Sequence, residues 1–330
     1  MQGNRQRRFV AYEDLGDTPN IVVDGAGNAA TAITLSHWPK SGTPRALKAD
    51  SSAEIVFNYL DSPGFHVAAT AASNNHFDED GLCGLYALIE PEAAMAMREL
   101  VVAVAEAGDF ATGHDRRAAR VAFTVAAFAD PERSPLDPAI FRLPYPAKTA
   151  ALYGELLPRF GDMLAHTDRF EEYWRAEDRA LTDSERALAR GEVAIEERPE
   201  AGLAILRIAG GPTAGPVEAA CHPMAVNNAT GCNRILAQQG RRYEFRYRYE
   251  SWVQFVSRPP PPRADLAPLA EALSRDEPGG ARWVFDGVAE ITPRLTLSGA
   301  EASAIPPEEF AQRLEEFLKG APAAWDPYDP

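Results

Sequence analysis

Short apolar runs rich in β-branched residues mark the first third of the chain. The runs NIVVDG (20–25) and TAITLSHW (31–38) are bounded by Gly or Pro turn signals, and the run HVAATAAS (66–73) follows another such turn. Each has the length and composition of a buried β-strand. Because a helical pattern separates the second run from the third, the order of elements predicts a parallel sheet with helices on its faces.

Helical periodicity fills the stretches around these strands. Ser51 and Glu54 have the spacing of a capping box at the start of a helix that extends to residue 60. A second helix is expected after Gly81, and Pro91 is placed to restart a helix that should stop at Gly108. One more helical pattern follows, DRRAARVAFTVAAFA.

The pattern of elements differs between the two halves of the chain. A Pro-rich stretch (130–146) and a charged helical stretch with i,i+4 charge pairs (about 147–190) separate them. Hairpin patterns and two helical patterns then follow, in the segments 193–208, 241–257, 265–275, 283–297 and 307–318. This second half is typical of an α+β domain with a mixed or antiparallel sheet. The chain is therefore predicted to be an α/β protein with three parts: an α/β domain (1–145), a helical linker (146–190) and a smaller α+β domain (191–330).

Composition narrows the classes of function. With 45% hydrophobic and 25% charged residues, the chain has the composition of an ordinary soluble globular protein. A formal charge of −15 disfavours a long nucleic-acid track, so an anionic ligand should be small or be met by a metal ion. Three cysteines are too few for a disulfide framework. No apolar stretch reaches membrane-spanning length, and no apolar segment follows the charged start, so a cytoplasmic protein is the simplest interpretation.

Candidate chemistry is concentrated in SNNHFDEDGLCGLYAL (73–88). His76, Asp78 and Asp80 occupy alternate positions, so they would point to one side if this segment were extended. Crowded carboxylates repel one another unless a cation lies between them, and oxygen ligands with one or two imidazoles favour Mn²⁺ or Mg²⁺. The alternative is a solvated acidic turn in which Asp80 is the N-cap of the next helix.

Two more side chains that can bind metal follow predicted strands. Asp24 ends IVVD and His37 ends ITLSH. Ligands of open parallel sheets bind at the carboxyl ends of the strands. Asp24, His37 and the acidic segment are therefore expected to meet at one edge of the sheet.

The stretch H-F-D-E-D-G-L (76–82) resembles the first motif of the DHH phosphoesterase superfamily, especially its RecJ exonuclease and archaeal members. In that superfamily a His or Asp followed by Asp-x-Asp-Gly supplies manganese ligands. Its members have an α/β domain with two metals, a helical linker and a smaller substrate domain called DHHA1. The segment FVSRPPPPRADLAPLAEAL (255–273) is similar to a strand and helix of that DHHA1 domain.

The resemblance implies hydrolysis of a phosphoester by water that one or two Mn²⁺ (or Mg²⁺) ions activate. It assigns catalytic and metal-binding roles to His76, Asp78, Asp80 and Asp109, the last standing for the second-motif aspartate. This sequence has no Asp-His-His triplet and no glycine-rich GGGH loop. His37 and Asp24 are therefore expected to replace the missing triplet, and His114 is a further candidate.

Substrate binding is assigned to polar residues of the second half. Arg246 and Arg248 share one face of a predicted strand, Ser257 and Arg258 follow on its continuation, and guanidinium groups suit phosphate or carboxylate. A solvated strand face is the alternative. His222 and Asn228 could reach a substrate, and an Asn-rich turn that caps the following helix is the other interpretation of that stretch.

The function predicted from the sequence is a metal-dependent phosphoesterase that acts on a small phosphorylated or nucleotide-like substrate. A catalytically inactive DHH-like binding or scaffold protein, with a residual metal site or helix cap, is the alternative. A processive exonuclease is disfavoured by the acidic charge and by the lack of a basic tract. No long nucleic acid and no membrane are expected as partners, and a homodimer is left open.

Overall fold

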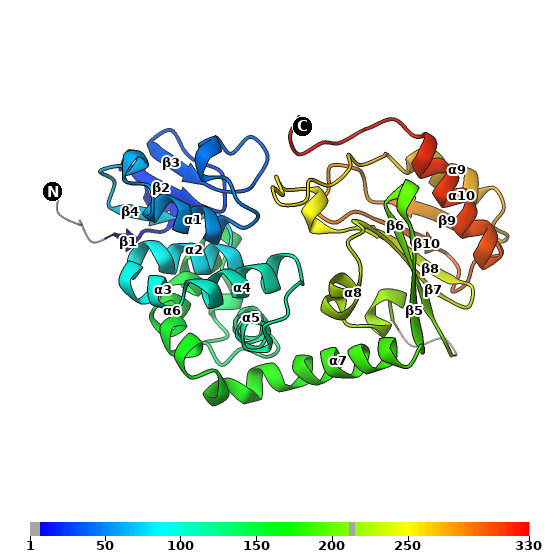
Figure 1. Ribbon diagram of the computed structural model, residues 1–330, viewed down its shortest axis with the longest axis horizontal. Coiled ribbons are helices and arrows are strands. Elements are labelled where there is room, and N and C mark those ends of the chain that lie inside the picture. The colour runs from blue at the N-terminus through cyan, green and yellow to red at the C-terminus, as the bar shows by residue number, and fades with distance from the viewer. Residues whose placement is uncertain (1–6, 211–214, 330) are drawn as a thin grey trace. The chain divides into compact units, whose positions relative to one another are not determined.

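The computed structural model of the protein describes residues 7–210 and 215–329. Contacts divide the chain into two compact units. The first unit comprises Met1–Asp178 and Phe255–Arg258, and the second comprises Arg179–Gln254 and Pro259–Pro330. Each contains a β-sheet with helices, so the α/β class predicted from the sequence is confirmed (Figure 1).

The sheet of the first unit has four strands in the order β1-β4-β2-β3, and every pairing is parallel. The strands are β1 (Arg8–Phe9), β2 (Asn20–Val23), β3 (Thr31–Leu35) and β4 (Ala71–Ser73). The strand predicted over 66–73 is thus correct only at its end. His66 and Val67 make hydrogen bonds with Tyr59 instead. Nε2 of His66 bonds to the backbone oxygen of Tyr59, and the Val67 amide donates to the Tyr59 hydroxyl.

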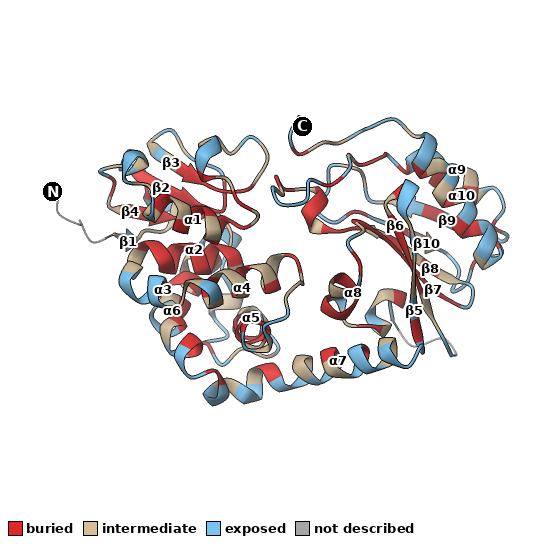
Figure 2. Cartoon of the chain, in the orientation of Figure 1, coloured by how far each residue is buried: buried red, intermediate tan, exposed pale blue. Residues whose placement is uncertain are grey.

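Helices pack on this sheet and on one another. They are α1 (Ser52–Leu60), α2 (Glu79–Ile89), α3 (Pro91–Ala96), α4 (Arg98–Asp109), α5 (Arg116–Ala129), α6 (Tyr145–Ala165) and α7 (Glu171–Ala189). The predicted N-cap of α1 is confirmed, because the Ser51 side chain accepts a hydrogen bond from the Glu54 amide. Most of α2 is buried, as Figure 2 shows, so its first turn is held firmly inside the unit.

The helix predicted from Pro91 to Gly108 is divided, because α3 ends at Ala96 and α4 begins at Arg98. Its end is close to the prediction, since α4 ends at Asp109, one residue after Gly108. A Cβ atom at Gly108 would lie 2.3 Å from the Cβ of Glu79 in α2, so the glycine is needed for close packing of the two helices. This packing places Asp109 beside the start of α2.

The predicted linker segment (146–190) is helical but is not one element. Helix α6 ends at Ala165, a 3₁₀ turn covers Thr167–Phe170, and α7 then begins. The division between the two units falls inside α7, after Asp178. Many residues of α7 are exposed, and its charge pairs include Glu171 with Arg175 at 3.0 Å (Figure 2).

The second unit has a six-stranded mixed sheet in the order β5-β6-β7-β8-β10-β9, as the α+β pattern predicted. Its strands are β5 (Val193–Arg198), β6 (Leu203–Ile208), β7 (Arg234–Gln239), β8 (Arg242–Tyr247), β9 (Arg282–Phe285) and β10 (Arg294–Ser298). Its helices are α8 (Pro223–Ala229), α9 (Ala267–Ser274) and α10 (Pro307–Gly320). Within the described residues, no helix combines the length and the apolar character that crossing a membrane requires.

Candidate metal centre

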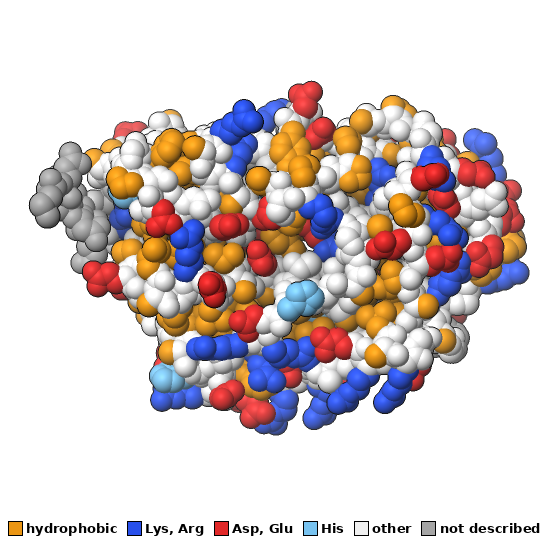
Figure 3. Space-filling view, viewed as in Figure 1, with side chains coloured by type: hydrophobic (Ala, Val, Ile, Leu, Met, Phe, Trp, Pro, Cys, Tyr) orange, Lys and Arg blue, Asp and Glu red, His pale blue; other side chains and the backbone are white. Residues whose placement is uncertain are grey.

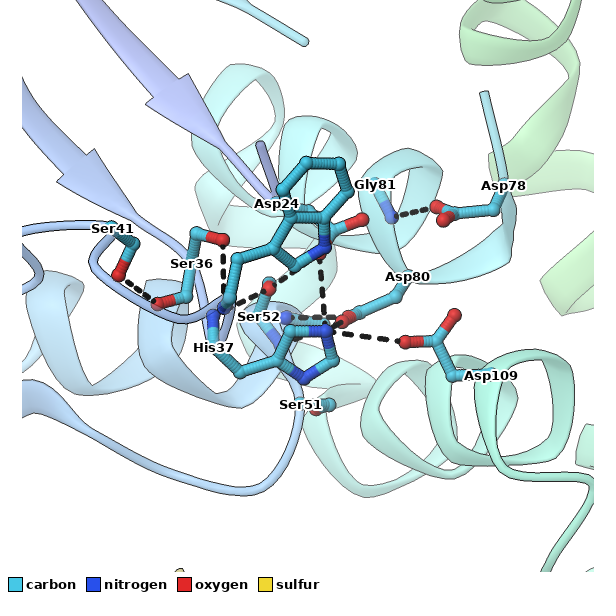
Figure 4. Close-up of polar contacts among 12 residues, drawn as sticks. Asp24, Ser36, His37, Ser41, Ser51, Ser52, Asp78, Asp80, Gly81 and Asp109 are labelled. Atoms are coloured by element: carbon cyan, nitrogen blue, oxygen red, sulfur yellow. Dashed lines mark hydrogen bonds and ion pairs between the residues drawn. The ribbon is translucent and has the colours of Figure 1, made fainter. Parts of the chain in front are cut away.

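Neighbouring strand ends of the first unit deliver the candidate ligands to one place. Asp24 directly follows β2, His37 follows β3 by two residues and His76 follows β4 by three. The strands β3, β2 and β4 are neighbours and run parallel, so the residues that follow them lie at the same end of the sheet. Asp109 reaches the same place from the last position of α4, as Figure 4 shows.

Asp24 lies at a sharp turn of the backbone. Its φ of 48° is in the left-handed region, which Asp tolerates better than most residues. The next residue is Gly25, where an added Cβ atom would lie 2.2 Å from Oδ1 of Asn75 and would require that side chain to move. Such backbone conformations persist where the surroundings fix them, and they are common at functional sites.

The His37 ring is held with one nitrogen toward a group of carboxylates. Its Nδ1 donates a hydrogen bond to the backbone oxygen of Asp50 at 2.7 Å. Nε2 is therefore the nitrogen that carries the lone pair in the neutral ring. Three carboxylate oxygens surround Nε2. They are Oδ1 of Asp24 at 3.3 Å, Oδ2 of Asp109 at 3.5 Å and Oδ2 of Asp80 at 3.9 Å.

Asp80 is fixed by the N-terminus of α1. Its two carboxylate oxygens accept hydrogen bonds from the amides of Ser52 at 2.6 Å and Ala53 at 2.7 Å. The Ser52 hydroxyl donates to Oδ1 of Asp24 at 2.7 Å, so one helix start positions two carboxylates. Asp80 lies in the first turn of α2 and not in an extended segment, which corrects the alternation expected for His76, Asp78 and Asp80.

Asp78, and not Asp80, is the N-cap of α2. Its Oδ1 accepts a hydrogen bond from the Gly81 amide at 2.8 Å, and its Oδ2 lies 2.7 Å from Nε2 of His76. The same His76 nitrogen is 3.2 Å from Oδ2 of Asp24. The His76 backbone is held by Asn74, whose Oδ1 accepts a hydrogen bond from the His76 amide at 3.1 Å.

Asp24 is shared by two groups of potential ligands. Asp24, His37 and Asp80 form one group and Asp24, His76 and Asp78 the other, and within each group one ligand atom per residue lies within 4.8 Å of the others. Oδ2 of Asp109 is buried and makes no hydrogen bond with the described residues, whereas the buried Oδ2 of Asp24 has an ion-pair contact with Nε2 of His76 at 3.2 Å. A buried carboxylate oxygen without a hydrogen-bond donor is costly, so this cluster could hold a metal ion.

The electrostatics of the metal-free cluster differ from group to group. Burial, and then the neighbouring carboxylates, raise the pKa of Asp80 and of Asp109 well above the ordinary value. Burial also acts on Asp24 and His76, and by itself would raise the pKa of Asp24 and lower that of His76. The hydrogen bond and the charge interaction with His76 outweigh burial, so the pKa of Asp24 is lowered. The pKa of His76 is raised to about 11, mainly by Asp78 and Asp24.

Replacing Gly81 by alanine is expected to disturb this cluster from behind. The added Cβ would lie 2.3 Å from Nδ2 of Asn74 and 2.4 Å from the Tyr153 hydroxyl, two groups that bond to each other at 3.0 Å. Overpacking of this kind costs about 1–3 kcal/mol of unfolding free energy, measurable by urea denaturation. Gly154→Ala is the matched control, because a Cβ atom there meets nothing within 4 Å, and an equal loss in both variants would contradict the role of Gly81.

Arg248 lies in the interior, which does not suit the substrate-binding role predicted from the sequence. Its side chain is only 1% exposed, and its guanidinium forms an ion pair with Glu250 and donates to the backbone oxygen of Thr230. Strand β8 ends at Tyr247, so Arg248 does not continue the face of Arg246. Arg246 itself pairs with Glu218 at 3.1 Å and is 15% exposed.

The other predicted substrate residues lie in different places. His222 is the N-cap of α8 and Asn228 lies within that helix, both in the second unit. Ser257 and Arg258 are exposed and belong to the first unit by their contacts. His114 is exposed and is not among the residues grouped as potential metal ligands in the described part of the chain.

Three residues that support the cluster were not predicted from the sequence. Ser52, Asn74 and the backbone of Asp50 hold ligands through ordinary hydroxyl, amide and carbonyl groups. Ser52 follows the predicted N-cap Ser51, and helix N-termini are known sites for anionic groups, so that position offered a weak clue.

Comparisons with known proteins give the family of the chain. Neither the curated proteins nor the solved structures gave a match. A family model matches residues 5–329, almost the entire sequence. The chain therefore belongs to DUF6687, a family of unknown function.

Proposed function

We propose that the first unit is the metal centre of a phosphoesterase that uses Mn²⁺ or Mg²⁺ to hydrolyse a small phosphorylated or nucleotide-like substrate. The observation that carries the proposal is the orientation of His37, whose Nε2 faces oxygens of Asp24, Asp80 and Asp109. A lone pair that faces several carboxylates is stabilised by a cation among them. The resemblance to the DHH phosphoesterases supplies the reaction class.

The side chains have separable tasks in this proposal. Asp24 is placed to contribute one oxygen to each ligand group, and His37 and Asp24 replace the ligands that an Asp-His-His triplet would provide. The negative charge of Asp80 would help to neutralise the bound ion, while its two oxygens continue to accept hydrogen bonds from the α1 amides. A divalent ion bound there would bring the pKa of a water ligand toward neutrality and offset charge on phosphoryl oxygens.

His76 has a different task from His37. Its Nε2 holds a proton between Asp78 and Asp24 in the metal-free protein, at 2.7 Å and 3.2 Å. It can ligate an ion only after this proton is released, since a metal ligand is the neutral imidazole. The ring of Trp38 lies 4.9 Å from that of His76 and limits its movement.

The substrate is expected to be small. The chain carries a formal charge of −15, and Figure 3 shows acidic and basic side chains interspersed over the face in view. A nucleic-acid track would need a continuous basic surface. Hydrolysis should therefore depend only weakly on salt concentration.

Mn²⁺-dependent release of p-nitrophenol from bis(p-nitrophenyl) phosphate, or of products from short oligonucleotides, tests the proposal. The wild type is expected to be active with Mn²⁺ and inactive with EDTA. Asp78→Ala should lose at least the roughly 10–100-fold that changes beside a metal ligand usually cost.

A scaffold protein is the second candidate, because Asp78 and Asp80 already serve as an N-cap and as an acceptor for α1 amides. Binding of Mn²⁺ without turnover of either substrate would favour that candidate. No binding of Mn²⁺ at all would reject the metal centre.

A further inference from the structure

The four-residue segment Phe255–Arg258 has an unusual place in the chain. By its contacts it belongs to the first unit, although the residues on both sides, Gln254 and Pro259, belong to the second. Its residues after Phe255 are exposed, with Val256 at 44%.

The carboxylate of Asp50 attaches this segment to the first unit. Its Oδ1 accepts hydrogen bonds from the amides of Val256 and Ser257, both at 2.7 Å, and its Oδ2 accepts one from the Ser257 hydroxyl at 2.5 Å. Hydrogen bonds to a carboxylate are stronger than those between neutral groups. One aspartate thus binds the segment with three of them.

The same residue begins the stretch that holds the candidate metal ligands. The backbone oxygen of Asp50 accepts the hydrogen bond from Nδ1 of His37 at 2.7 Å. Ser52 and Ala53 follow, and they bond to Asp24 and Asp80. The four residues from Asp50 to Ala53 therefore contact three of the ligands.

A second contact connects the segment to the fourth ligand. The ring of Phe255 packs edge-on against Phe110, with centroids 5.0 Å apart. Phe110 directly follows Asp109, and its ring lies 5.9 Å from that of His37. This contact is independent of Asp50 and contains no charge.

We propose that Asp50 is a positioning residue and that docking of the segment Phe255–Arg258 is coupled to cation binding at the metal centre. The inference rests on the metal centre of the proposed function. Partners that orient a metal-ligating histidine typically contribute 10–100-fold to metal affinity. Here the histidine's partner is itself held by the docked segment, so release of the segment loosens the ligands.

Mn²⁺ affinity, measured by the electron paramagnetic resonance signal of free Mn²⁺, tests the coupling. Asp50→Ala keeps the carbonyl that bonds to His37 but loses the attachment, and it should weaken binding about 10-fold or more. Phe255→Ala and Ser257→Ala change no charge and should weaken it in the same direction. Asp50→Asn, whose amide oxygen still accepts the two backbone hydrogen bonds, should stay within about threefold of the wild type.

Asp61→Ala is the matched control, since it removes the same charge at the opposite end of α1, where Asp61 is the C-cap. It should leave Mn²⁺ affinity unchanged. A loss in Asp50→Asn and Asp50→Ala alike, with none in the uncharged variants, would show a charge effect only and overturn the coupling.

Amide hydrogen exchange gives a reciprocal readout. Coupling between two binding events is symmetric. If release of the segment weakens Mn²⁺ binding by a given factor, Mn²⁺ should slow exchange of the Val256 and Ser257 amides by the same factor. Unchanged exchange together with wild-type affinity in all segment variants would overturn this inference and leave the phosphoesterase proposal intact. Failure of the wild type to bind Mn²⁺ would overturn both.

Discussion

Replacing Asp24 by asparagine is expected to abolish stabilisation by Mn²⁺ at concentrations that saturate the wild type. Asp24 offers one oxygen to each of the two ligand groups, so its loss weakens both. At 100 times its dissociation constant, a ligand stabilises the folded state by about 2.7 kcal/mol. That corresponds to a rise in melting temperature of roughly 5–10 °C for a unit of this size, and Asp24→Asn should show almost none of it.

Asp109→Asn should lose the same stabilisation but behave differently without metal. Asp24 is favourably paired in the metal-free protein, with a lowered pKa, so Asp24→Asn should reduce the unfolding free energy. The pKa of Asp109 is raised by burial and by neighbouring carboxylates, so Asp109→Asn should increase it. Thermal denaturation in EDTA and in Mn²⁺ gives the melting temperature of each of the two variants without and with metal.

The opposite signs distinguish a metal centre from a network that serves only to stabilise the fold. Asp14→Asn is the control, because Asp14 is exposed in the first unit and should respond to Mn²⁺ like the wild type. Mn²⁺ stabilisation that survives intact in both Asp24→Asn and Asp109→Asn would contradict the site.

Mn²⁺ affinity is expected to increase about 100-fold between pH 6 and pH 8 for each proton that the ion displaces. In the metal-free protein the pKa of His76 is about 11, so its ring is protonated throughout this interval. Binding must release that proton, and affinity therefore rises with pH. Calorimetry in buffers of different ionisation enthalpy counts the protons released.

The stability of the metal-free protein should change in the opposite direction. A histidine whose pKa is raised on folding stabilises the fold fully below its ordinary value of 6.5, and this stabilisation is lost as the pH rises through about 11. The raised pKa values of Asp80 and Asp109 act in the same sense above their ordinary value of 3.8. Mn²⁺ should thus raise the melting temperature more at pH 8 than at pH 6.

His76→Asn provides the control for this prediction. It should reduce the slope of log affinity against pH by one unit if His76 is a ligand. A pH-independent affinity in the wild type would show that His76 keeps its proton and does not bind the ion.

The sequence was sufficient for the elements whose signal is local. The β-branched runs at β2 and β3 and the helix N-cap at Ser51 lie where the pattern predicted them. The rule that parallel strands present ligands at their carboxyl ends brought Asp24 and His37 to the acidic segment, and the structure places them together. These predictions needed no knowledge of distant contacts.

Features that depend on distant neighbours could not be predicted. Gly108 was predicted as a helix end, and α4 ends one residue later, but its close contact with Glu79 of α2 could not be read from the sequence. Asp78 and Asp80 are both acceptable N-caps by sequence, and the position of the α1 amides decides that Asp80 points elsewhere. Arg248 has the charge of a surface residue, but Glu250 pairs with it in the interior.

The attachment of the segment 255–258 was beyond sequence reasoning for the same reason. Its hydrogen bond from Val256 joins residues 206 positions apart. The groups that receive and donate there are an ordinary aspartate, two amides and a serine hydroxyl, which have no distinctive pattern. Backbone groups leave no trace in a sequence, although they hold much of this site in place.

Anomalous scattering at the manganese edge, from crystals grown with Mn²⁺, shows directly whether these side chains share an ion. We expect a peak within coordination distance of Asp24 and His37, with Asp80 and Asp109 completing the site, and a second peak beside His76 and Asp78 if two ions bind. Crystals soaked in Mn²⁺ that show no peak among these residues, or a peak only at exposed carboxylates, would contradict the metal centre.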